Sequence, residues 1–399
     1  MVPFFKKGKP HKPPVLHRYA VLIPARNEET VIVPLIESIK NQNYPSELVT
    51  IFVVADNCTD STAELARNSG AVVFERFNRQ KIGKGYALDY LIRKIHQSYP
   101  RDAFDGYFVF DADNLLDENY IAEMNQIFSD GYKIITSYRN SKNYGDNWIS
   151  AGYSLWLLEE SKYFNHARML LNTSCSVSGT GFLFSREILE KTGGWKFFLL
   201  TEDFEFTVHH VIEGEKIGYC STAVFYDEQP VKFSQACRQR MRWAKGYLQV
   251  TKKYGMELLK RIFKGSFACF DIGMATILAV ALTILGITIN LPVAIAGFCS
   301  GDNLMMTLKS VLQPLVNAYL MFAAIGAVTT ITEWKRIHTS ALKKILYIFT
   351  FPLFMLTAVP ISFIALFKKV EWQPIYHNKG ITFQEIRDAD KKLLKRIAS

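Results

Sequence analysis

The six cysteines of this 399-residue chain show none of the paired C-x-x-C spacing typical of zinc sites. The chain also has no internal repeat and no low-complexity segment, and its 49% hydrophobic content excludes a disordered protein. The apolar stretch at the N-terminus, Met1–Phe5, is far too short for a signal-peptide core. We therefore expect the domain that follows to stay in the cytosol, with its cysteines reduced and packed as small hydrophobic side chains.

No charged residue occurs in three long stretches of the last third of the chain, 272–301, 310–332 and 345–367. Each stretch reaches or exceeds the roughly 20 residues that cross a hydrocarbon core. The net charge is +10, and basic residues gather beside these stretches. This placement fits the positive-inside rule and anionic lipid headgroups. We therefore expect a lipid bilayer, and no nucleic acid, as a partner.

Three plain crossings would leave the tail 368–399 outside, yet two lysines follow the last stretch directly and favour the inside. The last stretch contains Pro352 and Pro360, and the first is longer than one span. We expect 345–367 to be kinked or re-entrant, and the tail to be cytosolic. The segment 334–344 mixes apolar and basic residues and predicts an interfacial helix.

The first 270 residues alternate between short apolar runs and segments with helical spacing, which predicts an α/β domain. Continuous apolar strands between helices indicate a mostly parallel sheet covered on both faces. The expected strands are 19–23, stopped by Pro24, and 49–55, 71–74, 106–110, 133–137 and 182–185. The expected helices are 28–41, 61–69, 84–97, 148–168 and 204–213.

Polar residues follow three of these strands, at 24–28, at Asp56 and at Asp111-x-Asp113. Ligands of such sheets bind beyond the carboxyl ends of the strands, so these residues are expected to converge. Two carboxylates one residue apart can hold a divalent cation together with diphosphate oxygens. The alternative is a solvated acidic turn.

Two later motifs each allow two interpretations. Glu202 and Asp203 open a helix, where acidic residues suit the helix dipole, but they can also carry chemistry. Gln239, Arg242 and Trp243 lie in a very basic segment. A guanidinium suits a diphosphate and an indole face suits a sugar ring. The alternative is an interfacial amphipathic helix with a tryptophan anchor.

Taken in order, these motifs resemble inverting family 2 glycosyltransferases, above all the membrane-integrated processive group of cellulose, chitin and hyaluronan synthases. The resemblance covers residues 18–250 and implies a Rossmann-like GT-A fold that binds nucleotide-diphospho-sugars, followed by transmembrane helices. It implies Mg or Mn at Asp113, a general base at Asp203, and acceptor binding by Glu202 and Trp243. It also implies that the nucleotide-sugar donor is bound by Glu28, Asp56, Lys84, Asp111, Gln239 and Arg242.

The sequence departs from the processive synthases in having no transmembrane segment before the catalytic domain and only a short hydrophobic tail. These features favour a non-processive transferase that adds one sugar to a lipid-linked acceptor. The complete Gln-x-x-Arg-Trp element instead favours processive synthesis on a growing glycan, from a UDP-sugar donor, which we expect. The expected layout is a basic segment 1–17, a cytosolic transferase domain 18–250, interfacial and transmembrane helices 251–367 and a cytosolic tail 368–399, in a plasma-membrane protein. No short motif encodes the donor sugar or the oligomeric state.

Overall fold

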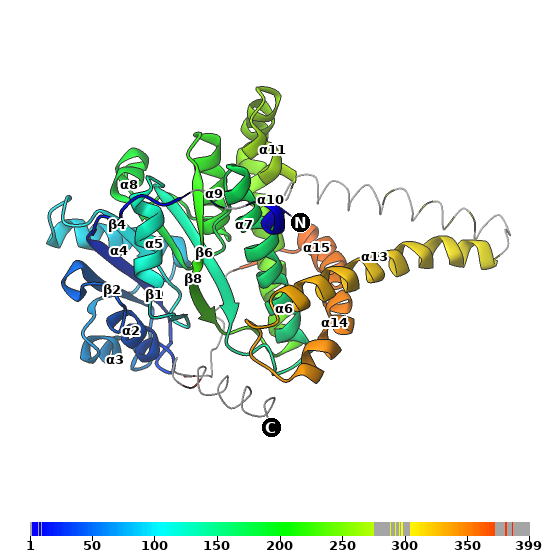
Figure 1. Ribbon diagram of the computed structural model, residues 1–399, viewed down its shortest axis with the longest axis horizontal. Coiled ribbons are helices and arrows are strands. Elements are labelled where there is room, and N and C mark those ends of the chain that lie inside the picture. The colour runs from blue at the N-terminus through cyan, green and yellow to red at the C-terminus, as the bar shows by residue number, and fades with distance from the viewer. Residues whose placement is uncertain are drawn as a thin grey trace.

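The computed structural model describes residues 2–274 and 304–371, apart from Lys7 and Lys9, and a few single positions beyond them. Most of the charge-free stretch 272–301 and nearly all of the tail after 371 lie outside the described residues, so the predictions made for them are not addressed. The five cysteines within the described part are free thiols. Figure 1 shows an α/β body from which helix α13 projects to one side.

The first half of the chain builds four parallel strands in the order β3-β2-β1-β4. These strands are β1 Tyr19–Ala25, β2 Val49–Asp56, β3 Val72–Arg76 and β4 Gly106–Val109. The connecting helices are α2 Ile32–Lys40, η1 Ser46–Leu48, α3 Thr62–Asn68 and α4 Lys84–Ser98. The strand–helix alternation predicted from the apolar pattern is confirmed here, with ends that differ by a few residues.

The second half completes an eight-stranded sheet of order β3-β2-β1-β4-β7-β6-β8-β5. Strand β7 is antiparallel to β4 and β6, β6 is parallel to β8, and β5 is antiparallel to β8. The parallel sheet predicted from the strands of the first half is confirmed there, whereas this half, whose sequence is less regular, adds antiparallel pairs. A buried apolar run does not reveal the direction of a strand. The added strands are β5 Leu115–Leu116, β6 Ile134–Ser141, β7 Phe182–Ser185 and β8 Ile217–Asp227.

Pro24 does not end the first strand as predicted but lies within β1, opposite Val54 of β2. On its other edge, β1 pairs with β4 only as far as Leu22. A proline is tolerated in a strand where its missing N–H would not join the ladder. The strand can therefore continue past Pro24 to the site edge.

Helices cover both faces of the sheet, as predicted. One core cluster joins Leu22, Phe52 and Phe184 to Leu88 of α4 and Phe206 of α9. The other cluster packs α2 and α5 against the opposite face. The remaining helices of this region are α5 Tyr120–Ser129, α8 Arg186–Thr192 and α9 Glu202–Ile212.

The predicted long helix 148–168 is interrupted by a π-helix. It consists of α6 Trp148–Glu159, the π-helical segment η2 Glu160–Asn165 and α7 His166–Leu171. Asn147 caps α6 by accepting hydrogen bonds from the backbone N–H groups of Ile149 and Ser150. π-Helical turns are rare and are frequently found at functional sites.

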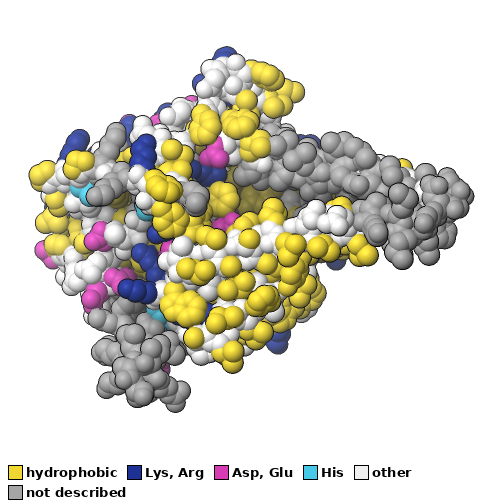
Figure 2. Space-filling model, turned by 45° about the vertical axis from the view of Figure 1, so that its right-hand side comes forward, with side chains coloured by type: hydrophobic (Ala, Val, Ile, Leu, Met, Phe, Trp, Pro, Cys, Tyr) yellow, Lys and Arg dark blue, Asp and Glu magenta, His cyan; other side chains and the backbone are white. Residues whose placement is uncertain are grey.

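Helices α11 and α15 pack against a long basic helix, α10 Phe233–Phe263, whereas α13 and α14 pack against each other and against α6. Two described segments, Leu312–Thr332 and Ala341–Phe367, are long and apolar enough to cross a membrane. Figure 2 shows a broad face of hydrophobic side chains beside the projecting part of the molecule. The other helices are α1 Val2–Phe5, α11 Phe267–Gly273, α13 Leu304–Thr332, α14 Ala341–Leu356 and α15 Ala358–Phe367.

The break between α14 and α15 is held by α10. Arg240 donates to the Phe354 carbonyl at 2.9 Å and to the Thr357 hydroxyl at 2.6 Å. Lys245 donates to the Ala365 carbonyl at 3.0 Å. The helix is interrupted at Thr357, and its second part, α15, lies along α10. That 345–367 is kinked or re-entrant in the membrane stays a prediction.

The connector between α13 and α14 is not the predicted interfacial helix, because residues 333–340 form turns that pack on the sheet. Tyr138 of β6 donates to the buried Glu333 at 2.5 Å. The Arg336 guanidinium lies 3.9 Å from the centre of the same tyrosine ring. These contacts fix the end of α13 to the α/β body.

His210 of α9 is buried, and neither of its ring nitrogens has a hydrogen-bond partner in the structure. Burial, followed by the effect of His209, lowers the pKa of His210 to about 3. A buried unsatisfied polar group costs about 1–3 kcal/mol. We therefore expect His210→Leu to raise the free energy of unfolding by about 1 kcal/mol at neutral pH, measured by thermal unfolding in detergent.

The gain from His210→Leu should grow as the pH falls. The unfolded chain takes up a proton on this histidine near its ordinary pKa of 6.5, whereas the folded chain does so only near 3. As the pH falls from 6.5 toward 3, the free energy of unfolding of the wild-type protein therefore decreases. The variant lacks this histidine and does not show this decrease. If the stabilisation by His210→Leu became smaller toward pH 5, the interpretation of His210 as a buried, uncharged side chain would be contradicted.

Candidate active site

One cavity of about 470 Å³ opens beyond the carboxyl ends of β1, β2 and β4. It is bordered by the N-terminal ends of α4 and α9 and by α10. Every residue singled out in the sequence lines this cavity. These residues are Glu28, Asp56, Lys84, Asp111, Asp113, Glu202, Asp203, Gln239, Arg242 and Trp243.

Two asparagines with positive φ turn the chain at the ends of β1 and β2, Asn27 at 57° and Asn57 at 54°. Asparagine tolerates this left-handed conformation better than most residues. The turns present Glu28 and Asp56 to the cavity. Asp56 is buried and forms an ion pair with Arg76 of β3. Burial raises the pKa of Asp56, and Arg76 opposes the rise.

Asp111 and Asp113 have different surroundings. Lys84, the first residue of α4, contacts Asp111 with Nζ 2.5 Å from Oδ1. Asp113 is 5% exposed, and its Oδ2 accepts the backbone N–H of Glu228 at 3.0 Å. A solvated turn, the alternative for this motif, does not describe such a buried and hydrogen-bonded carboxylate.

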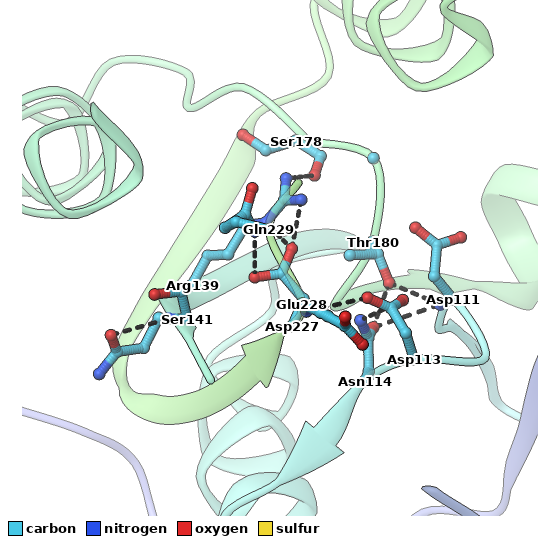
Figure 3. A network of polar contacts seen from close by, with 12 residues as sticks. Asp111, Asp113, Asn114, Arg139, Ser141, Ser178, Thr180, Asp227, Glu228 and Gln229 are labelled. Carbon is cyan, nitrogen blue, oxygen red and sulfur yellow. Dashed lines mark hydrogen bonds and ion pairs between the residues drawn. The ribbon is translucent and has the colours of Figure 1, made fainter. Parts of the chain in front are cut away.

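The glycine-containing turn before β7, residues 178–181, connects Asp111 and Asn114 by hydrogen bonds (Figure 3). Thr180 Oγ1 accepts the N–H of Asp111 at 2.8 Å and donates to Asn114. The carbonyl of Gly179 accepts from Lys84 at 2.7 Å. Gly181 has φ of 65°, and a Cβ there would lie 2.2 Å from the Phe225 ring. Only glycine therefore fits this close approach.

Arg139 is a site residue that the sequence did not reveal. It projects from β6, donates to Asp227 at the end of β8 and also donates to the Ser178 carbonyl at 3.0 Å (Figure 3). It thereby joins the strand ends of the second half of the sheet to the glycine turn. Its only sequence signal was a basic residue in a polar stretch, which does not distinguish a buried strand end from a loop.

Glu202 and Asp203 form the first turn of α9 and line the cavity. The N-cap residue is Thr201, and it makes no side-chain capping bond. Burial, followed by the charge of Asp203, raises the pKa of Glu202 to about 7. Burial also raises the pKa of Asp203, against the opposing effects of the Phe204 N–H and Lys84. Raised pKa values suit groups that exchange protons near neutral pH.

Helix α10 brings the last three predicted residues to the cavity. Arg242 donates to the Leu200 carbonyl at 2.7 Å, just before α9. Gln239 has a buried side-chain oxygen with no hydrogen-bond partner in the structure. Trp243 packs against Trp156 and Tyr153, with ring centroids 5.5 and 5.8 Å apart. The indole is therefore half-buried at the cavity wall, not displayed on an outer helix face.

Comparison with known proteins agrees with this geometry. The profile of the family described as "Glycosyltransferase like family 2" matches residues 17–246. The chain is 27% identical over 269 residues to the probable glycosyltransferase YdaM of Bacillus subtilis, covering 61% of this chain and 59% of that protein. It is 26% identical over 251 residues to beta-monoglucosyldiacylglycerol synthase of Nostoc, covering 60% and 51%. The chain thus spans about half to three-fifths of the length of these relatives.

The fold is also found among solved structures. The mannosyltransferase PcManGT from Pyrobaculum calidifontis, in complex with GDP-Man and Mn2+, matches with a TM-score of 0.54 and 16% identity. The match covers 89% of this chain and 90% of that one. This likeness shows a GT-A type nucleotide-sugar transferase fold with a mixed sheet. Because the family profile covers more than half of the sequence, the chain belongs to glycosyltransferase family 2.

Proposed function

We propose that the protein is an inverting, metal-dependent glycosyltransferase that moves a sugar from a UDP-sugar to a growing glycan at the membrane. The observation that carries this proposal is that all ten predicted side chains, from six separate segments, line one cavity. They supply both the carboxylates and the cations that such a transfer needs. Family membership and the GT-A fold support the same activity.

In this proposal, the strand ends bind the donor. Glu28, Asp56 and Asp111 engage the nucleotide, since carboxylates accept hydrogen bonds from base and ribose groups. Lys84 is released from Asp111 when phosphate oxygens arrive, and it then contacts the diphosphate. The short contact between Lys84 and Asp111 supports this exchange, because it holds the ammonium at the cavity wall.

We place Mg or Mn at Asp113, with Asp111 beside it. In the part of the chain that the structure describes, no group of three or more metal-ligating side chains gathers. Two carboxylates nevertheless fit a hard cation whose other ligands are phosphate oxygens and water. The bound ion supplies charge neutralisation of the departing diphosphate. Arg242 and Gln239 contact the same diphosphate, Arg242 through its guanidinium and Gln239 through its amide N–H donors.

Asp203 acts as the general base. It takes the proton of the acceptor hydroxyl while the hydroxyl oxygen bonds to the anomeric carbon of the donor. The bond from that carbon to the diphosphate breaks on the opposite face, so the configuration inverts. Glu202 and the Trp243 ring hold the acceptor. The raised pKa of Asp203 supports the assignment, because a more basic carboxylate takes the proton of the acceptor hydroxyl more readily.

A single addition to a lipid-linked acceptor is the second candidate. Its support is the apolar end of the cavity, where Leu157, Phe164 and Ile272 line the wall. Ile272 belongs to α11 and is the first residue of the charge-free stretch 272–301. The apolar tail of a lipid-linked acceptor could pack against these side chains.

We further propose an integral plasma-membrane protein with a cytosolic catalytic domain. Support comes from the two candidate spans and from exposed hydrophobic side chains on α14 and α15, such as Leu342, Phe349 and Phe367. We assign a crossing to α13 and an in-plane or re-entrant position to the broken helix α14–α15. The contacts of Arg240 and Lys245 along the broken helix support that position.

A donor screen tests the proposal. The purified chain in detergent is incubated with UDP-sugars and GDP-sugars, with and without a chelator, and nucleoside diphosphate release and product length are measured together. We expect chelator-sensitive release from a UDP-sugar and a ladder of products. A single addition would favour the second candidate, and no release from any donor would refute both.

Trp243→Ala separates an acceptor platform from a structural tryptophan. We expect the variant to stay folded and to bind donor like the wild-type protein, although it loses packing against Trp156 and Tyr153. It should lose most of its product, because the acceptor ring loses the face on which it stacks. Trp334→Ala, in the connector outside the cavity, is the matched control. Product of normal length and yield from Trp243→Ala would remove the acceptor role and the main argument for processive synthesis.

A further inference from the structure

Glu160 is a cavity carboxylate to which none of the sequence motifs gives a role. It is the first residue of the π-helical segment that interrupts the predicted helix. Its side chain lines the cavity, whereas that of the neighbouring Glu159 does not. The two adjacent glutamates therefore have different positions, although the sequence alone makes them look alike.

Glu160 lies at the same end of the cavity as the proposed base. Ser178 Oγ donates a hydrogen bond to its carboxylate. The next residue, Gly179, lies against Asp203, since a Cβ on this glycine would be 3.7 Å from Asp203 Oδ2. The Tyr247 hydroxyl is influenced by both carboxylates, which add to the effect of burial in raising its pKa. Glu160 and Asp203 therefore flank the Ser178–Gly179 turn.

Two arginines, each shared with another carboxylate, compensate the charge of Glu160. Burial raises its pKa, and Ser178, Arg139 and Arg168 oppose this rise. Each arginine is already paired with another carboxylate, Arg139 with Asp227 and Arg168 with Asp271. These arginines favour the ionised form of Glu160, which keeps accepting capacity for a hydroxyl group that enters the cavity.

Aromatic rings stand beside this carboxylate. Trp156 precedes Glu160 by four residues, also lines the cavity, and packs against Trp243. A sugar ring has apolar faces and several hydroxyl groups. The two indoles offer surfaces on which such a ring can stack, and the carboxylate can accept a hydrogen bond from one of its hydroxyl groups. A simple alcohol at the end of a lipid would use only Asp203 and would give the buried carboxylate no donor besides Ser178.

We infer that Glu160 binds a second hydroxyl group of the acceptor, adjacent to the one that reacts, and thereby selects a sugar ring over a lipid alcohol. This inference rests on the proposed transferase function. Discrimination follows from the cost of leaving a buried charged acceptor unpaired, as in other sites built to bind a hydroxyl group.

The test uses two acceptor probes of equal chain length, octyl β-glucoside and 1,2-dioctanoylglycerol, the second with a single free hydroxyl. The full chain is held in a detergent without a sugar headgroup, with the donor found in the screen. Release of nucleoside diphosphate above the rate without probe is measured. We expect stimulation by the glucoside and little by the glyceride.

Glu160→Gln keeps the shape and an oxygen for Ser178, but loses the charge. We expect the KM for octyl β-glucoside to rise about 10- to 100-fold, the range for a lost hydrogen bond to a charged group. The affinity for donor, measured by titration, should stay within about twofold, which also shows that the variant is folded. Glu159→Gln is the matched control and should leave the KM unchanged.

The outcomes separate the inference from the function. Preference for the glyceride, or an unchanged KM in Glu160→Gln with wild-type turnover intact, overturns the role of Glu160 and leaves the transferase standing. Absence of turnover from any donor removes the proposed function, and the inference with it. A raised KM confined to Glu160→Gln supports the inference.

Discussion

Asp203→Asn is expected to abolish sugar transfer while leaving donor binding nearly unchanged. The carboxylate lies against the glycine turn and lines the cavity. A general base acts on the acceptor hydroxyl, and its loss costs about 10²–10⁴-fold in rate. Turnover and donor affinity, measured separately, test both halves of the expectation.

The controls for Asp203→Asn address helix capping. Asn retains a side-chain oxygen for the first turn of α9, so unfolding should occur near the wild-type temperature. Glu213→Gln removes an exposed carboxylate at the opposite end of the same helix and should retain full activity. If Asp203→Asn kept more than about a tenth of the wild-type turnover, a structural role for Asp203 would be the better interpretation.

Asp113→Ala is expected to lose metal-dependent donor binding. The proposed cation would lose a buried carboxylate, and even indirect damage to metal sites weakens them about 10–100-fold. Donor titration with Mg, with Mn and with a chelator measures the effect. For the variant, the three curves should coincide at low affinity.

Asp113 also accepts the Glu228 N–H, so the alanine variant loses a hydrogen bond as well as a charge. Asp113→Asn keeps an oxygen for that hydrogen bond and should still lose the metal dependence. Asp117→Asn, outside the cavity lining, is the neutral control. Equal donor affinity of the wild-type protein with and without chelator would refute the metal site.

The sequence predicts the first half of the sheet well, because each of its strands is a continuous apolar run that ends at a polar residue. It fails for β8, Ile217–Asp227, in which Tyr219, Ser221 and Thr222 interrupt the apolar pattern. The pairing of β7 with β4 and β6 depends on contacts between distant segments, which a local pattern does not record. The mixed sheet therefore appears only in three dimensions.

The site residues also fall into two groups, those that local sequence patterns predict and those that they do not. Short motifs at strand ends and helix starts located all ten predicted cavity residues, because local turns fix where such side chains point. Arg139 and Glu160 escaped prediction for different reasons. Arg139 lies in the polar part of a strand, and Glu160 belongs to a Glu-Glu pair that resembles a solvated helix face. Trp156, four residues earlier in α6, also lines the cavity, so the packing of this helix in the fold turns Glu160 inward.

The configuration of the first product tests the central claim most directly. One base, Asp203, and direct displacement of the diphosphate require that the anomeric configuration of the donor be inverted. Proton NMR of the product, recorded early in the reaction with the donor found in the screen, reports the configuration of the new bond. We predict a β-linked product from an α-linked UDP-sugar, and an α-linked product would contradict the account.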